Sequence, residues 1–167
     1  MRSVAGGSDM LPPPMNPIFL RPDQGEFFSI IGGGVRMLAD SAATGGQCTI
    51  LEAPIPPGEG PPLHKHTHED EVFFILEGRF KFRLDDREFL GEAGAFNYAP
   101  RGSMHTFKNV GPATGRLYIV CMPGGIDKPF RAMKDPPTGS NHPKPGPDQV
   151  VAILEQHGIT FHGPPLD

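Results

Sequence analysis

Residues 58–78 read GEGPPLHKHTHEDEVFFILEG, and residues 94–109 read GAFNYAPRGSMHTFKN. Together they hold four side chains of the types that bind divalent transition metals: His64, His66, Glu71 and His105. Three imidazole nitrogens and one carboxylate oxygen leave open positions on a six-coordinate ion, and a substrate can react at an open position. The two stretches therefore predict a metal site.

The spacing of these side chains sets a geometric condition. His64 and His66 are two residues apart, and alternate side chains of an extended chain share a face. Glu71 follows His66 by five residues, an odd separation that places it on the opposite face of a regular strand. For Glu71 to join the histidines, the chain must break register, and the polar run 67–70 is the predicted turn or bulge. Two sets of residues then share a strand face: Glu71, Phe73 and Ile75, and later His105, Phe107 and Asn109.

The rest of the chain predicts an all-β protein, an antiparallel sandwich or barrel of short strands. Glycine (22) and proline (21) are frequent, as expected for many turns. Residues 72–76 are continuously apolar, which predicts a strand buried on both faces. Residues 80–84 alternate between apolar and charged side chains, which predicts a strand with one buried and one solvent-exposed face. The other predicted strands are 27–31, 35–38, 48–55, 87–90, 95–99, 105–110 and 116–122.

The two ends of the chain differ from this central region, which spans residues 15–123. Residues 1–14 are rich in glycine, serine and proline, and predict a flexible tail. Residues 124–147 are proline-rich and predict a segment that crosses one end of the barrel. A helix follows, predicted to start at Asp148 as N-cap, to end at Gly158 and to pack on the outside of the barrel. Its predicted apolar face consists of Val150, Ile153, Leu154 and His157.

Composition narrows the class of protein. The 167 residues suit one domain with a real core, and the net charge of −4 without a basic stripe argues against nucleic acid as a partner. No apolar stretch approaches the roughly 20 residues that span a bilayer. The chain begins without a secretory signal, so we expect a cytoplasmic protein with no membrane association. Cys48 and Cys121 are expected to be reduced residues of the core.

Both stretches match the signature motifs of the cupin superfamily. The first motif, G-x5-H-x-H-x4-E-x6-G, is filled by Gly58, His64, His66, Glu71 and Gly78. The second motif, G-x5-P-x-G-x2-H-x3-N, is filled by Gly94, Pro100, Gly102, His105 and Asn109. The chain thus resembles small single-domain bacterial cupins similar to quercetin 2,3-dioxygenase, and the resemblance is strong over residues 45–123.

The resemblance implies a double-stranded β-helix, a jelly-roll barrel, with a C-terminal helix. The barrel would hold one divalent transition metal (Fe, Mn, Ni, Co or Zn) on His64, His66, Glu71 and His105; the alternative is a scaffold without metal. His68 is expected at the rim of the site or behind these ligands, and Glu69 and Asp70 are expected in solvent, with Asp70 a possible substitute carboxylate. Asn109 is expected to stabilise a turn. The expected lining of the substrate pocket is Phe73, Ile75, Phe96, Tyr98, Met104 and Phe107.

Three functions remain open on the sequence. The first is a dioxygenase acting on a flavonol or another enolisable aromatic, with Glu71 as a metal ligand that also accepts the substrate hydroxyl proton. The second is a non-redox metal enzyme, a cyclase, isomerase or lyase, which would work without oxygen. The third is a cupin that binds a small molecule without turnover. By analogy with the superfamily, a homodimer is expected, paired through the strands at 27–31 and 35–38.

Overall fold

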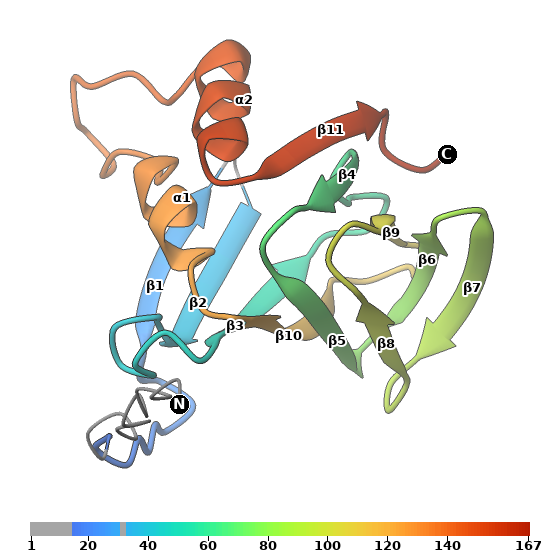
Figure 1. Ribbon diagram of the computed structural model, residues 1–167, viewed down its shortest axis with the longest axis horizontal. Helices are drawn as coiled ribbons and strands as arrows, with labels where there is room; N and C mark the ends of the chain where they lie inside the picture. Colours follow the sequence, from blue (N-terminus) through green and yellow to red (C-terminus); the bar gives the residue numbers. More distant parts are fainter. Residues whose placement is uncertain (1–14, 31–32) are drawn as a thin grey trace, which may run out of the picture.

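Two antiparallel sheets face each other in the computed structural model, which describes residues 15–30 and 33–167 (Figure 1). The predicted tail and Ile31 lie outside the described residues. The first sheet has the order β1-β2-β3-β10-β5-β8, and the second has the order β11-β4-β9-β6-β7. The strands of the first sheet are β1 (Glu26–Ile30), β2 (Gly33–Ala39), β3 (Thr49–Ile55), β10 (Gly115–Met122), β5 (Asp70–Glu77) and β8 (Phe96–Ala99). Those of the second are β11 (Ile159–Gly163), β4 (Leu63–His66), β9 (Met104–Asn109), β6 (Arg79–Leu84) and β7 (Arg87–Glu92).

This arrangement confirms the predicted all-β barrel. Each strand expected from the sequence forms within a few residues of its expected bounds. Glycines allow the turns between them, since Gly78 and Gly94 have φ values of +93° and +90° that other residues rarely adopt. One strand was not predicted: β11 pairs with β4 along the edge of the second sheet, so the C-terminal segment belongs to the barrel.

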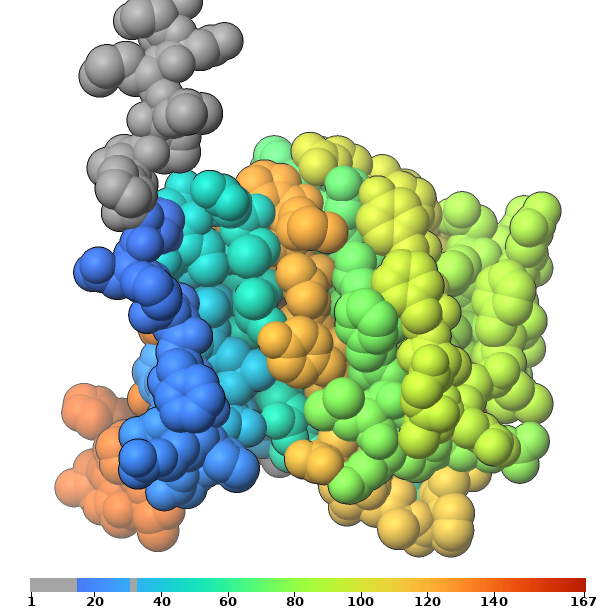
Figure 2. Space-filling view, turned by 90° about the horizontal axis from the view of Figure 1, so that it is seen from below, coloured from blue at the N-terminus to red at the C-terminus, as the bar shows by residue number. Residues whose placement is uncertain are grey.

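Strand β5 is buried along one face, but its other face is buried only at Val72 in the apolar run, so the prediction of two buried faces was wrong. Phe73 and Ile75 point into the core, whereas Phe74 and Leu76 are 41% and 39% exposed. Figure 2 shows the reason, because the outer face of the first sheet, including β10, β5 and β8, is not covered by another layer. The continuous apolar run at residues 72–76 therefore arises because the outer face of the sheet is itself apolar, and not because another layer covers that face.

Two helices lie side by side at one end of the barrel, near β1 and β2 (Figure 1). Helix α1 (Asp127–Ala132) forms inside the proline-rich segment that was predicted to be a loop, and its flanking residues Ile126 and Met133 are buried. Among the described residues, neither helix is long and apolar enough to cross a membrane.

The C-terminal helix α2 (Pro147–Gln156) starts earlier than predicted, because its N-cap is Gly146 and not Asp148. Proline suits the first helical position, since it lacks the N–H that has no partner there, so the cap precedes Pro147. The backbone N–H of Gly146 donates to Oε1 of Gln149 at 2.9 Å. Gly158 has a φ of +79° just after the helix, which confirms it as the end.

Candidate metal centre

The structure brings the four predicted ligands together inside the barrel. His64 and His66 come from β4, and His105 comes from the neighbouring β9, where it lies directly across from His64. Glu71 comes from β5 in the opposite sheet. All four are buried, and one ligand atom from each lies within 4.8 Å of the others.

The register break that Glu71 requires is a crossing between sheets. The chain leaves the second sheet after His66 and enters the first sheet at Asp70, with a bend at residues 67–69. Two contacts fix this bend, because Thr67 N–H donates to the Gly158 carbonyl oxygen at 2.8 Å and Gly102 N–H donates to the His66 carbonyl oxygen at 2.7 Å. The histidines and Glu71 therefore reach one point from facing walls.

Each histidine is oriented by a contact at Nδ1 that leaves Nε2 free for the centre. Nδ1 of His64 lies 2.8 Å from the Pro62 carbonyl oxygen, and Nδ1 of His105 lies 3.2 Å from that of Ser103. A carbonyl oxygen only accepts, so both Nδ1 atoms carry a proton, and an Nε2 atom offers its lone pair to an ion once it carries none, which for His105 means giving up the hydrogen bond to Glu71. This is the tautomer that a metal ligand of the Nε2 type needs.

The separations between donor atoms fit a first-row metal ion. Oε2 of Glu71 lies 2.9 Å from Nε2 of His105 and 3.5 Å from Nε2 of His66. Bonds of about 2.1 Å place neighbouring donors about 3.0 Å apart in an octahedron and about 3.4 Å apart in a tetrahedron. The residues present therefore fit the ion that the chemistry of the donor set suggests.

The charges of the site are strongly coupled. Burial and the neighbouring His105 lower the pKa of His64 to about 3, so this imidazole is neutral. Burial works against ionisation of Glu71, but the charges and hydrogen bonds of the histidines, His66 first, outweigh it and lower the pKa of the carboxyl group. Burial also opposes the charge on His66, yet the carboxylates of Glu71 and Glu69 raise its pKa above the usual value.

Metal binding at pH values just above 6.5 is therefore expected to release a proton from His66. At such a pH, the raised pKa keeps His66 more fully protonated than an ordinary histidine, which has a pKa of about 6.5. A histidine must be neutral to bind a metal ion, so binding displaces this proton. Metal affinity should fall as the pH drops through this pKa, by up to about tenfold per unit. His64 contributes no proton in this range. Calorimetry in two buffers of different ionisation enthalpy measures the released proton, and a pH-independent affinity would contradict the expectation.

The side chains behind the ligands differ from those predicted. His68 is exposed beside Gly158 and does not support a ligand, because the bend turns it outward. Asp70 pairs with Arg101 through Oδ1 at 2.9 Å, which holds the pKa of its carboxyl group below the usual range and directs it away from the centre. Glu69, predicted to be solvated, is instead buried with Oε2 at 3.5 Å from Nδ1 of His66.

A cysteine supports the fourth ligand. Sγ of Cys121 lies 3.7 Å from Oε1 of Glu71, inside the barrel. Burial raises the pKa of the Cys121 thiol, so it stays protonated and can donate to the carboxylate. Both cysteines are free, as predicted, although Cys48 is only half-buried.

A cavity of about 510 Å³ opens onto His64, His66 and Glu71. Phe73 and Phe107, which were expected to line a substrate pocket, line this cavity. Its walls also include residues from both helices and from β11: Ile126, Phe130, Met133, Leu154, Ile159 and Phe161. Leu154 thus faces the cavity, and α2 closes one end of the barrel instead of packing on an intact wall.

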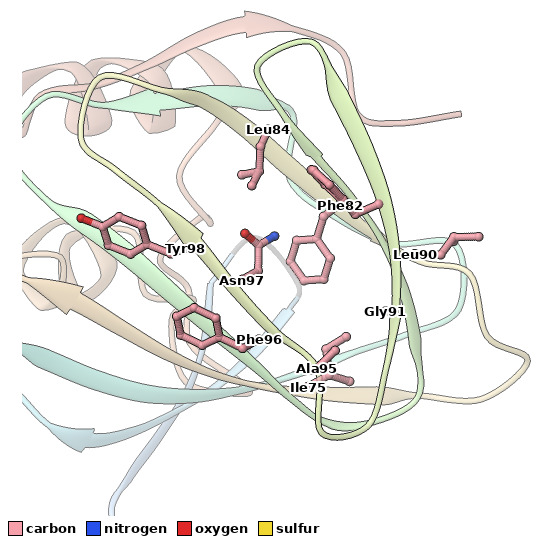
Figure 3. A pocket seen from close by; sticks show the side chains of 10 residues that line it. Ile75, Phe82, Leu84, Leu90, Gly91, Ala95, Phe96, Asn97 and Tyr98 are labelled. Carbon is pink, nitrogen blue, oxygen red and sulfur yellow. The ribbon is translucent and has the colours of Figure 1, made fainter.

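The other predicted pocket residues lie elsewhere. Ile75, Phe96 and Tyr98 line a second hollow of about 320 Å³ between β7 and β8, shown in Figure 3. Three phenylalanine rings, whose centroids lie 5.6 to 5.9 Å from one another, separate the two hollows: Phe73, Phe82 and Phe107. The inward-facing side chains of β8 are Asn97, which the sequence did not single out, and the buried Ala99, while Phe96 and Tyr98 are 59% and 44% exposed. Met104 is half-buried and lines neither hollow.

Asn109, the last residue of the second motif, stabilises a turn as expected. Its side-chain nitrogen donates to the carbonyl oxygens of Ile55 and Ala113, each at 2.8 Å. Its Oδ1 accepts the N–H of Gly111 at 2.9 Å. These contacts hold the end of β9 and do not reach the candidate centre.

Comparison with known proteins agrees with the barrel. Residues 51–121 match the family described as "Cupin domain", and this range contains all four ligands. The central region of the chain is therefore similar to a cupin domain. Among solved structures, an RmlC-like cupin from Shewanella frigidimarina superposes with a TM-score of 0.58 at 21% identity, covering 68% of this chain and 96% of that one. At this identity the likeness supports the fold alone.

Two other relatives have a higher sequence identity to this chain over the residues that align. Quercetin 2,3-dioxygenase from Bacillus subtilis is 25% identical over 140 residues, which are 84% of this chain and 41% of the relative. An uncharacterized protein from Methanocaldococcus jannaschii is 36% identical over 73 residues, which are 44% of this chain and 57% of that protein. The chain therefore spans less than two thirds of the length of either relative.

Proposed function

We propose that this protein is a metal-dependent dioxygenase that acts on a flavonol-like or another enolisable aromatic substrate. The observation that carries the proposal is the apolar cavity of about 510 Å³ that ends at three of the four ligands. Its volume lies within the range of about 300–1,000 Å³ that is usual for small-molecule sites. The similarity to quercetin 2,3-dioxygenase supports the same substrate class.

The character of the cavity wall favours a flat apolar molecule over a small acid. Among the described residues that line it there is no lysine or arginine, so a dicarboxylate would find no permanently charged cationic side chain. The exposed lining residues Pro56 and Glu59 mark where the cavity reaches the surface. An aromatic ring entering there would pass apolar walls and reach the rings of Phe73 and Phe107.

Each part of the centre has a role in this proposal. A divalent transition ion, when bound, would supply Lewis acidity and, if redox-active, electron transfer with dioxygen. His64, His66 and His105 would hold the ion through Nε2. Glu71 is the only buried carboxylate in the described cavity lining, and its lowered pKa keeps it ionised and able to accept the substrate hydroxyl proton. The apolar walls exclude water from the reacting atoms.

Oxygen consumption tests the proposal. Iron, manganese, nickel and cobalt forms of the protein are each mixed with flavonols and other enolisable aromatics, and we expect at least one form to consume oxygen as substrate disappears. His64→Ala protein serves as the control and should show neither change. Turnover without oxygen would point to non-redox chemistry instead, and turnover of oxalate in place of the aromatics would contradict the proposed substrate class.

A further inference from the structure

Glu69 is a buried carboxylate between two ligands that the metal centre as described so far does not use. It follows His66 by three residues and precedes Glu71 by two, inside the bend that joins the sheets. The side chain is almost fully buried, with 8% of its surface exposed. Burying a carboxylate is costly unless a partner compensates for lost hydration, so its position needs an explanation.

The atom that Glu69 faces is Nδ1 of His66. Oε2 of Glu69 lies 3.5 Å from it, within the range of an ion pair and slightly beyond an ordinary hydrogen bond. Neither atom has another hydrogen-bond partner in the described structure. His66 is also the only ion-pair partner of Glu69 found within the described ranges.

The three ligand histidines are therefore supported in different ways. Backbone carbonyl oxygens face Nδ1 of His64 and His105, whereas a carboxylate faces Nδ1 of His66. A carbonyl oxygen sets the tautomer of an imidazole, and a carboxylate sets the tautomer and also adds negative charge that makes the ring a stronger donor. Of the three, His66 alone has this support.

The surroundings hold the Glu69 side chain in this position. The hydrogen bond from Thr67 N–H to the Gly158 carbonyl oxygen anchors the bend on one side. On the other side, Gly125 packs so closely that a Cβ there would lie 3.3 Å from Oε1 of Glu69. The carboxylate thus lies between the bend and the segment before α1, aimed at the His66 ring.

We propose that Glu69 is a positioning residue of the metal centre, which accepts the Nδ1–H of His66 and strengthens Nε2 as a metal donor. The inference rests on the metal centre underlying the proposed function, and it does not depend on the substrate. It assigns to Glu69 the role that the sequence suggested for His68.

Metal affinity and the spectrum of a bound ion test this role without any need for turnover. Glu69→Gln keeps the shape of the side chain and an acceptor oxygen but removes the charge. We expect its affinity for cobalt(II) to fall about 10- to 100-fold, the usual effect of losing support behind a ligand. The visible absorption bands of the bound cobalt(II) should shift. The unfolding temperature of the metal-free variant should stay close to that of the wild type, because packing is retained.

The controls separate a specific role from a general one. Glu155→Gln changes an exposed glutamate of α2 and should bind cobalt(II) like the wild type. A Glu69→Gln variant with wild-type affinity and spectrum would overturn the inference, and so would one whose only change is a lower unfolding temperature. If the wild-type protein itself binds no ion, the assignment of the metal centre is refuted, and this result is known before any variant is made.

Discussion

Replacing His64 or His105 with alanine is expected to lower metal affinity by more than about a hundredfold. Each residue supplies one Nε2 to the centre, and removing a ligand should cost more than the 10- to 100-fold loss that follows when only its support is removed. The two side chains lie across from each other on β4 and β9, with ring centroids 4.4 Å apart. Elemental analysis after dialysis against a buffered free ion measures the loss.

The neighbouring His68 provides the matched control. It is two residues from His66 and has the same chemistry, but it is exposed, so His68→Ala should keep full metal occupancy. Thermal unfolding gives a second measurement, because an ion at a hundredfold excess over its Kd stabilises a protein by about 2.7 kcal/mol. That stabilisation should persist in His68→Ala and disappear in His64→Ala. Full occupancy in His64→Ala would refute the assigned centre.

The sequence was sufficient to predict that the four candidate ligands meet at one point, because their positions depend on local geometry. His64 and His66 alternate along one strand, so strand parity alone predicts that they share a face. Glu71 was recovered because a break in register was required before it, and polar residues between the strands allowed one. The structure adds that the break is a crossing from one sheet to the other.

The alternation of side chains along a strand does not apply within the bend at residues 67–69, and the predictions failed there. His68 was assigned behind the ligands and Glu69 to solvent, but the structure reverses the two. Side-chain directions in a bend depend on how the sheets and the flanking loops meet, which involves contacts with Gly125 and Gly158, far away in the sequence. A buried glutamate has no local signal that separates it from an exposed one.

Strand β8 shows a second limit of sequence patterns. Phe96 and Tyr98 alternate with Asn97, and the apolar pair was assigned to the pocket. The structure places the polar residue inside and the aromatic residues on an uncovered sheet face. Hydrophobicity predicts the buried face only when the other face meets water, and here the outer face is apolar as well.

Helix α1 was missed because its stability does not come from its own sequence. A helix of six residues is too short to form alone in water. It is held by tertiary contacts of Arg131, which pairs with Glu26 and Asp40. These contacts join segments that are far apart in the chain, so a proline-rich stretch was read as a loop.

Replacing Asp127 with alanine is expected to lower the free energy of unfolding by about 3 kcal/mol. Oδ1 of this buried carboxylate accepts the Ser41 N–H at 3.1 Å and the Thr49 hydroxyl at 2.9 Å. Oδ2 accepts the Ser41 hydroxyl and an N–H of Arg131, each at 3.1 Å. Alanine leaves these donors without their acceptor, at a cost of about 1–3 kcal/mol for each one that stays buried and unpaired. Arg131 keeps its ion pairs with Glu26 and Asp40, so the substitution does not leave its guanidinium group without a partner.

Urea unfolding of the metal-free protein measures this loss. Asp148→Ala removes an exposed aspartate from the first turn of α2 and should cost less than about 1 kcal/mol. Asp127→Asn keeps an acceptor oxygen and should fall between the two. A loss for Asp127→Ala no larger than that for Asp148→Ala would show that the buried contacts contribute little to stability.

The same substitution separates the cavity from the metal centre. Asp127 begins the helix that contributes Phe130 to the cavity wall, with Ile126 and Met133 on either side, whereas all four ligands lie on β4, β5 and β9. A folded Asp127→Ala protein should therefore bind cobalt(II) with nearly wild-type affinity, while its KM for an aromatic substrate rises because α1 no longer closes the cavity firmly. Loss of metal binding in the folded variant would mean that α1 supports the ligands as well as the wall.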